Sequence, residues 1–243
     1  MPKLRRPAAF AALALGLVLL APPSWAQTRP PLAERIAKAQ GLDRYDQVDA
    51  IRYTFNITLP GVTISRSWDW QIKTGQVTYA GKDKDGKPVR VTYSRAQLDS
   101  APANVRDEIE PAFVNDEYNL FFPLHVYWDE SAEVSDAGVQ KLPLGKGSAR
   151  QVVVKYPSDG GYTPGDTWDL WVRSDYRVEA FAYHRGGANP PHLVIATWAG
   201  YKKAGPFLLS TDRHGTADGK PIRIFFTNVS VKLAGSDKWM AAR

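Results

Sequence analysis

The chain has 243 residues, a formal net charge of +6 at pH 7 and no cysteine. The absence of cysteine excludes disulfides, a thiol nucleophile and a cysteine-ligated metal site. Lysine and arginine are scattered along the sequence and show no zinc-finger spacing, so we expect no binding of nucleic acid.

The N-terminal segment has the organisation of a secretory signal. Residues 3–6 are mostly basic, residues 8–21 form an apolar run, and Ser24–Ala26 provide a small-x-small ending. The apolar run is shorter than the ~18 residues that span a bilayer. We therefore expect residues 1–26 to be cleaved, and residues 27–243 to form a single periplasmic or secreted domain without a stable membrane anchor.

The segment after the signal begins with a helical pattern. Leu32 and Ile36 lie one helical turn apart, Gly41 is a suitable stop, and residues 42–48 add a further helical turn. The periodicity of apolar residues then changes from helical to that of a strand.

A long hairpin is the clearest strand signal. Residues 51–59 alternate strictly between apolar and polar side chains, which is typical of an antiparallel strand with one face in the core. Pro60 and Gly61 provide a turn, and residues 62–70 continue with one apolar face. We predict further strands at residues 76–80, 87–93, 151–156, 167–173, 176–184, 192–199, 207–212 and 221–233.

A helical insertion interrupts the strands. Apolar side chains in residues 105–113 recur at helical spacing, Pro111 divides two helices, and the chain returns to strands after Pro123. The last strand changes phase near residues 227–228, which predicts a β-bulge and a curved sheet. The predicted fold is mainly β within the α+β class, a curved antiparallel sheet with helices on one face.

This order of elements resembles that of the LolA-like and LppX-like superfamily of envelope proteins. The matching segments are Leu32–Val48, Ala50–Leu59, Phe113–Leu124, and Trp168–Val172 leading into Val178–His184. The resemblance implies an unclosed antiparallel half-barrel with helices on its concave side. It also implies transport or sequestration of a lipid, a lipidated protein or another amphiphile. The local motifs of the lipoprotein chaperone itself are not matched.

Aromatic residues are the candidates to line a cavity for acyl chains, because such cavities are mostly apolar. They are Tyr53, Phe55, Trp68, Trp70, Tyr79, Tyr93, Trp168 and Phe181. Ordinary core packing uses the same residue types, and this alternative stays open. Side chains of the helical insertion form either a lid over the cavity or a plug that fills it: Val105, Ile109, Phe113, Tyr118 and Phe121.

Arg66 is a candidate polar contact of the ligand. Strand parity places it on the same face as Ile64 and Trp68. In one interpretation its guanidinium stands at the cavity mouth and binds an anionic head group or a carbonyl. In the other it makes a structural contact with a neighbouring aromatic ring.

Residues for metal binding or catalysis are not apparent in the sequence. The loop at residues 83–86 lacks the acidic groups that a calcium loop needs at Gly81 and Thr92, so we interpret it as a hairpin turn. The histidines are widely separated. Asp166 and Asp169 have opposite strand parity, and no serine-nucleophile elbow is present.

The hypothesis from the sequence is a non-enzymatic carrier or binding protein, monomeric and without a cofactor or metal, whose partner is a lipid or a lipidated protein. Two alternatives stay open at this point. One is a secreted enzyme that acts on an envelope polymer and uses an unrecognised carboxylate pair. The other is an envelope scaffold whose apolar face meets a protein partner.

Overall fold

The computed structural model describes residues 30–83, 85–162 and 164–243. The expected signal segment, residues 1–26, lies outside the described residues. The helical elements are α1 (Pro31–Ala39), η1 (Leu42–Gln47), η2 (Arg95–Ser100), η3 (Val105–Ile109) and α2 (Glu110–Trp128). The strands are β1 (Val48–Leu59), β2 (Val62–Gln71), β3 (Gln76–Lys82), β4 (Pro88–Ser94), β5 (Glu133–Lys141), β6 (Ser148–Lys155), β7 (Thr167–Val172), β8 (Val178–His184), β9 (Leu193–Thr197), β10 (Ala199–Ala204), β11 (Phe207–Ala217), β12 (Lys220–Leu233) and β13 (Trp239–Ala241).

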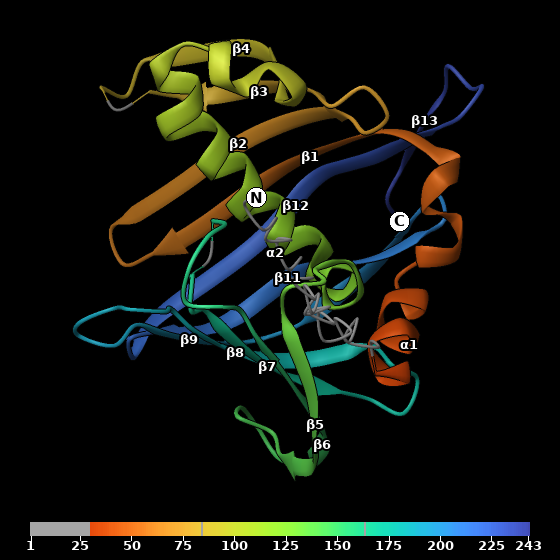
Figure 1. Ribbon diagram of the computed structural model, residues 1–243, viewed down its shortest axis with the longest axis vertical. Coiled ribbons are helices and arrows are strands. Elements are labelled where there is room, and N and C mark those ends of the chain that lie inside the picture. The colour runs from red at the N-terminus through yellow and green to blue at the C-terminus, as the bar shows by residue number, and fades with distance from the viewer. Residues whose placement is uncertain (1–29, 84, 163) are drawn as a thin grey trace, which may run out of the picture.

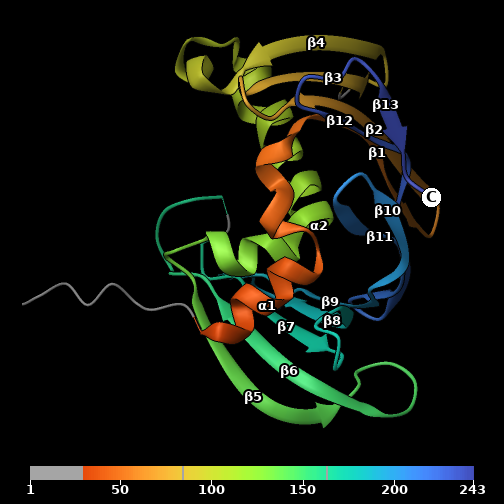
Figure 2. The same ribbon diagram turned by 90° about the vertical axis from the view of Figure 1, so that its right-hand side faces the viewer.

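The strands of the described residues form one antiparallel sheet. Their order is β4-β3-β2-β1-β12-β11-β9-β8-β7-β6-β5, with β10 added to β11 and β13 added to β12. The edge strands β4 and β5 do not pair with each other, so the sheet is not closed into a barrel. The sheet curves around α1 and α2, which lie in its concavity (Figures 1 and 2). The predicted fold class is confirmed.

The hairpin of β1 and β2 follows the predicted alternation. Tyr53 pairs with Trp68 and Phe55 with Arg66. The odd-numbered side chains of β1 and the even-numbered side chains of β2 therefore point together toward the helices. The predicted bulge in the last strand is present. The residue paired with Arg52 is Ser230 and that paired with Thr54 is Thr227, so β12 accommodates one extra residue at this point.

Three strands that the sequence did not predict are β5, β10 and β13. In β5, most side chains are exposed, among them Val139. The backbone hydrogen bonds to β6 hold this edge strand in the sheet, and its side chains do not alternate between apolar and polar, so it leaves no periodic signal in the sequence. This is why β5 was missed.

The end of the helical insertion differs from the prediction. The sequence predicted that the helix ends at Pro123, but α2 continues to Trp128. Proline has no N–H, so it cannot donate to the carbonyl of Asn119 one turn earlier. The guanidinium of Arg213 on β11 supplies the missing donor through a short hydrogen bond to that carbonyl, and its Nη1 donates to Asn119 Oδ1 (3.2 Å). A residue distant in sequence therefore allows the helix to continue.

Arg213 itself is fully buried, and no carboxylate pairs with it in the part of the chain that the structure describes. Burial lowers its pKa to about 9. Its guanidinium carbon lies 3.5 Å from the ring centroid of Trp198, a cation–π contact that offsets part of the cost of burial. The cation thus holds α2 against β11.

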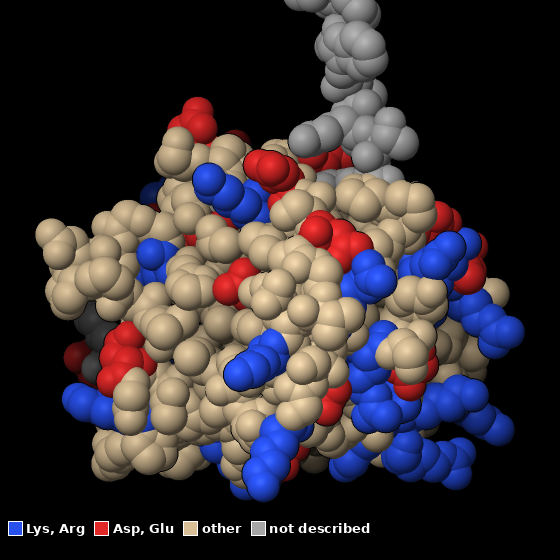
Figure 3. All heavy atoms as spheres, turned by 90° about the horizontal axis from the view of Figure 1, so that it is seen from below, with Lys and Arg blue, Asp and Glu red and all other residues tan. Residues whose placement is uncertain are grey.

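The face of the molecule that Figure 3 shows carries both positive and negative side chains. Figure 3 shows Asp and Glu side chains among Lys and Arg side chains over much of this face, with Lys and Arg more frequent along one edge. This face therefore has no charge of a single sign across its whole extent.

Candidate functional site

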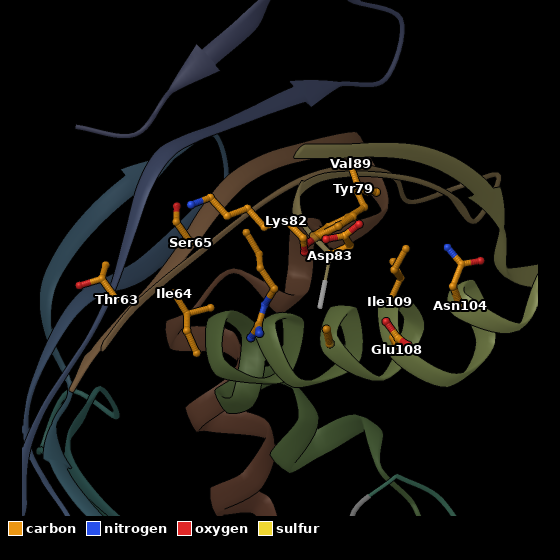
Figure 4. A pocket seen from close by; sticks show the side chains of 12 residues that line it. Thr63, Ile64, Ser65, Tyr79, Lys82, Asp83, Val89, Asn104, Glu108 and Ile109 are labelled. Carbon is orange, nitrogen blue, oxygen red and sulfur yellow. The ribbon is translucent and has the colours of Figure 1, made fainter. Parts of the chain in front are cut away.

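Two hollows lie between the sheet and different faces of the helical insertion. The larger has a volume of about 830 Å³ and is bounded by α2 and by residues of β1, β7, β8, β9, β11 and β12. The smaller, about 680 Å³, is bounded by η3, α2 and residues of β2, β3 and β4 (Figure 4). Both volumes lie within the range of small-molecule sites, ~300–1,000 Å³.

The larger hollow is apolar along the sheet. Every second side chain of a strand points to the same face of the sheet. On the concave face, these side chains are aliphatic or aromatic and form one wall of the hollow. This wall contains Phe55, Ile57, Trp168, Phe181, Val194, Ile222 and Ile224. The helix contributes the opposite wall, in which Val114 is apolar and Asn115, Tyr118 and Asn119 are polar.

The polar end of the larger hollow lies at the loops that follow β6 and β8. Asp166 is 4% exposed and accepts hydrogen bonds from Tyr183 Oη (2.8 Å) and from the backbone N–H of Gly186 (2.7 Å). Burial and the hydrogen bond to Asp166 raise the pKa of Tyr183. Arg185 and His192 complete this end of the lining.

The smaller hollow has a mixed polar lining. Tyr79, Lys82 and Asp83 come from β3 and the loop after it, and Asn104 and Glu108 line the space from the helical insertion (Figure 4). Charged side chains stand on both walls of this hollow, whereas those of the larger hollow lie at one end, so the larger hollow has the longer apolar stretch for an acyl chain.

An ion pair lies between the two hollows. Arg66, which lines the smaller hollow, donates from Nε to Asp116 Oδ2 (2.7 Å) and from Nη2 to Oδ1. Asp116 also accepts from Trp68 Nε1 (2.8 Å) and from Asn115 Nδ2 (3.0 Å), and Asn115 lines the larger hollow. Burial raises the pKa of Asp116, and Arg66 acts in the opposite direction. The guanidinium also lies 5.1 Å from the ring centroid of Phe55.

The predicted site residues are distributed over the two hollows and the core. The larger hollow contains Phe55, Trp168, Phe181 and Tyr118. The smaller contains Arg66, Tyr79 and Ile109. The others are buried in the hydrophobic core: Tyr53, Trp68, Trp70, Tyr93, Val105, Phe113 and Phe121.

Sequence reasoning missed the aliphatic part of the lining. Ile57 continues the apolar parity of β1, and Ile222 and Ile224 continue that of β12, so the same alternation would have found them. Arg185 and His192 had no such signal, because their proximity depends on the pairing of β8 with β9.

A buried ionic network lies at the C-terminal end of α2. His125 donates from Nε2 to Glu117 and from Nδ1 to Asp129, each at 3.0 Å. Its ring stacks on Tyr118, with the centroids 3.8 Å apart. Asp129 also accepts from Tyr118 Oη (2.8 Å) and Tyr156 Oη (2.7 Å). Burial alone lowers the pKa of His125, but the charge of Glu117 and the hydrogen bonds to both carboxylates outweigh it and raise the pKa to about 10.

This network predicts a pH-dependent stability. An unfolded histidine has a pKa of about 6.5, so between that pH and about 10 the chain takes up a proton at His125 on folding. The stabilisation is complete below the unfolded pKa and is lost as the pH rises through the folded one. We expect the free energy of unfolding to fall by up to ~1.4 kcal/mol per pH unit within this window.

Urea unfolding at a series of pH values measures this slope. His125→Gln should remove the contribution, whereas His214→Gln, which changes a surface histidine with 61% of its side chain exposed, should retain it. Equal slopes in the two variants would show that His125 does not take up the proton.

Among the described residues, His, Asp, Glu and Cys side chains form no group of three that could hold a metal ion. In the same part of the chain, none of the helices is long and apolar enough to cross a membrane.

No protein-family model and no curated protein matches the sequence. Solved structures to which the chain is similar include a DUF1329 family protein from Desulfovibrio piger, with a TM-score of 0.47, 11% identity, and coverage of 85% of this chain and 92% of that chain. A LolA superfamily protein from Nitrosomonas europaea has a TM-score of 0.45 and 8% identity, with coverage of 82% and 93%. Mycobacterium tuberculosis lipoprotein LppX has a TM-score of 0.30 and 11% identity, with coverage of 82% and 94%. The resemblance predicted from the order of elements is thus found among solved structures. The two hollows are defined by residues of this chain alone.

Proposed function

We propose that this protein is an exported, non-enzymatic carrier or binding protein that holds an amphiphile, with the acyl chain in the larger hollow. The observation that supports this function is the hollow of about 830 Å³, which has an apolar wall from the sheet and polar groups at one end. Residues 27–243 form a single half-barrel domain in this proposal, and the signal at residues 1–26 directs it to the periplasm or the exterior.

Apolar burial is sufficient to bind such a ligand. Each methylene group moved from water into an apolar site contributes ~0.8 kcal/mol. Several methylenes in the larger hollow therefore provide micromolar or tighter affinity without a specific polar contact, after the cost of immobilising the ligand. This is why a carrier of this kind leaves no short motif in its sequence.

The carboxylate at the larger hollow favours binding over hydrolysis. Asp166 is the one carboxylate that lines this hollow within the described ranges, and both of its oxygens accept hydrogen bonds from the protein. General acid–base hydrolysis of a glycosidic bond uses two carboxyl groups that flank the scissile bond. The enzyme hypothesis therefore receives no support from this site.

A pair of matched substitutions tests the proposal. Val194→Phe places a ring in the apolar wall of the larger hollow, whereas Val139→Phe adds the same ring on β5, where Val139 is 67% exposed. A ring that displaces two methylenes of a bound chain should weaken the binding of a fluorescent fatty acid about tenfold or more. The affinity of the Val139→Phe variant should equal that of the native chain.

Thermal unfolding of both variants provides the control, because added volume at Val194 can cost ~1–3 kcal/mol of stability. Native mass spectrometry of the chain purified without detergent shows whether lipid accompanies it. A native chain that does not bind the probe, or a Val194→Phe variant that is folded and binds it unchanged, would contradict the proposed site.

A further inference from the structure

We infer that the amphiphile held in the larger hollow carries an anionic head group, and that Arg185 binds it. This inference rests on the proposed function, since it concerns the polar end of the same hollow. Arg185 and His192 both line that end, and they lie opposite each other in the loop that joins β8 to β9. The backbone N–H of Arg185 donates to the carbonyl of His192 at 3.1 Å.

This backbone bond fixes the two side chains on one side of the sheet. Directly paired residues of antiparallel strands point to the same face, and here that face is the lining of the hollow. The next residue, Gly186, packs against the loop that follows β6 so closely that a Cβ would lie 2.2 Å from the carbonyl oxygen of Pro164. The β8–β9 loop is therefore held in place at the polar end of the hollow.

The carboxylates near this end are already occupied. Asp166 accepts from Tyr183 and from the N–H of Gly186. Asp218 accepts from His192 Nδ1 (2.6 Å) and from the N–H of Leu193 (2.9 Å). Each oxygen of the two carboxylates accepts one of these hydrogen bonds, and neither carboxylate is hydrogen-bonded to Arg185 among the described residues.

Donors, in contrast, are available. No acidic side chain within the described residues forms an ion pair with Arg185, and its side chain is exposed. A guanidinium carries five N–H donors and no acceptor, and it matches the planar pair of oxygens of a carboxylate or phosphate. The hydroxyl of Tyr183 is not available as a donor to a ligand, because it donates its proton to Asp166. The guanidinium of Arg185 therefore offers free donors and a positive charge at this end, and it favours a ligand acceptor that is negatively charged.

Three lipids with the same acyl chain distinguish the possible head groups. Palmitate carries a carboxylate, palmitoyl lysophosphatidic acid a phosphate, and monopalmitoylglycerol a neutral glycerol ester. We expect the native chain to bind both anions more tightly than the neutral lipid in isothermal titration calorimetry, with a difference that decreases as salt is added. Whichever anion binds more tightly identifies the head group as a carboxylate or a phosphate.

Arg185→Gln should weaken the binding of both anions about tenfold and leave that of monopalmitoylglycerol unchanged, because a charge-assisted hydrogen bond is lost while the apolar wall is intact. Arg173→Gln is the matched control at the opposite end of β7 and β8, and it should change none of the three affinities. Thermal unfolding shows whether each variant is folded.

The outcomes separate this inference from the proposed function. Equal affinities of the native chain for the anions and the neutral lipid, or an equal loss for all three in Arg185→Gln, would overturn the assignment of the head group and leave the amphiphile site intact. If none of the three lipids binds to the native chain, the proposed function itself fails, and the inference with it.

Discussion

Arg66→Met is expected to lower the free energy of unfolding by ~3–5 kcal/mol, because it leaves the carboxylate of Asp116 buried without its cation. The Asp116 side chain is fully buried, and the guanidinium of Arg66 is its charged partner, at 2.7 Å from Nε to Oδ2. Trp68 and Asn115 still donate to this carboxylate in the variant, but neither is charged. Urea unfolding monitored by tryptophan fluorescence measures the loss.

Two further variants separate the burial of charge from the loss of a contact. In Arg66→Met combined with Asp116→Leu, both charges are replaced by apolar groups, and most of the stability should return. Arg150→Met breaks an exposed ion pair with Asp136, in which the side chains are 50% and 40% exposed, and should cost ~1 kcal/mol or less. A loss in Arg66→Met no larger than that in Arg150→Met would show that Asp116 is not held as a buried anion.

The same Arg66 variant addresses the two interpretations of this residue. If Arg66 binds a head group, the Arg66→Met and Asp116→Leu double variant should bind the lipid probes more weakly although it is folded. If the role of Arg66 is structural, through the ring of Phe55 and the ion pair with Asp116, the double variant should bind them as the native chain does.

The second large effect is an energetic coupling between Arg213 and Pro123. Arg213→Met leaves the carbonyl of Asn119 without a donor, since Pro123 cannot supply one. An unsatisfied buried acceptor costs ~1–3 kcal/mol. In a Pro123→Ala background the N–H of residue 123 reaches this carbonyl, so Arg213→Met should be less destabilising there.

A double-mutant cycle of the two substitutions measures this difference directly. We expect a coupling energy of ~1–3 kcal/mol between positions 213 and 123, which isolates their shared carbonyl from the other effects of each change. Those effects include the volume lost at Pro123 and the removal of the cation that stacks on Trp198. Strictly additive substitutions would show that Arg213 does not replace the missing helix bond.

The same pair of residues shows where sequence reasoning stops. The alternation in residues 51–59 predicted β1 and its hairpin, because a strand records its buried face in every second side chain. Pro123 predicted a helix end, because proline removes a hydrogen bond locally. The donor that compensates comes from Arg213, 94 positions from Asn119, and no local pattern indicates it.

The division between cavity and core could not be predicted for a related reason. Tyr53 and Phe55 occupy the same face of β1 and are both buried, yet Phe55 lines the larger hollow and Tyr53 does not. The difference depends on where α2 lies above the strand. Strand parity specifies which face is apolar, whereas the position of the helix specifies which part of that face is filled.

The position of α2 has a consequence for the energy of binding. Its first residue, Glu110, accepts hydrogen bonds from Tyr93 on β4 (2.6 Å) and from Arg95 (2.8 Å), close to one edge of the sheet. Just beyond its last residue, Asp129 accepts from Tyr156, which follows β6 near the other edge. The helix thus connects the two ends of an open sheet and fixes the distance between them. These contacts hold the walls of the larger hollow in place, so a ligand need not supply the free energy that would otherwise be spent on ordering them.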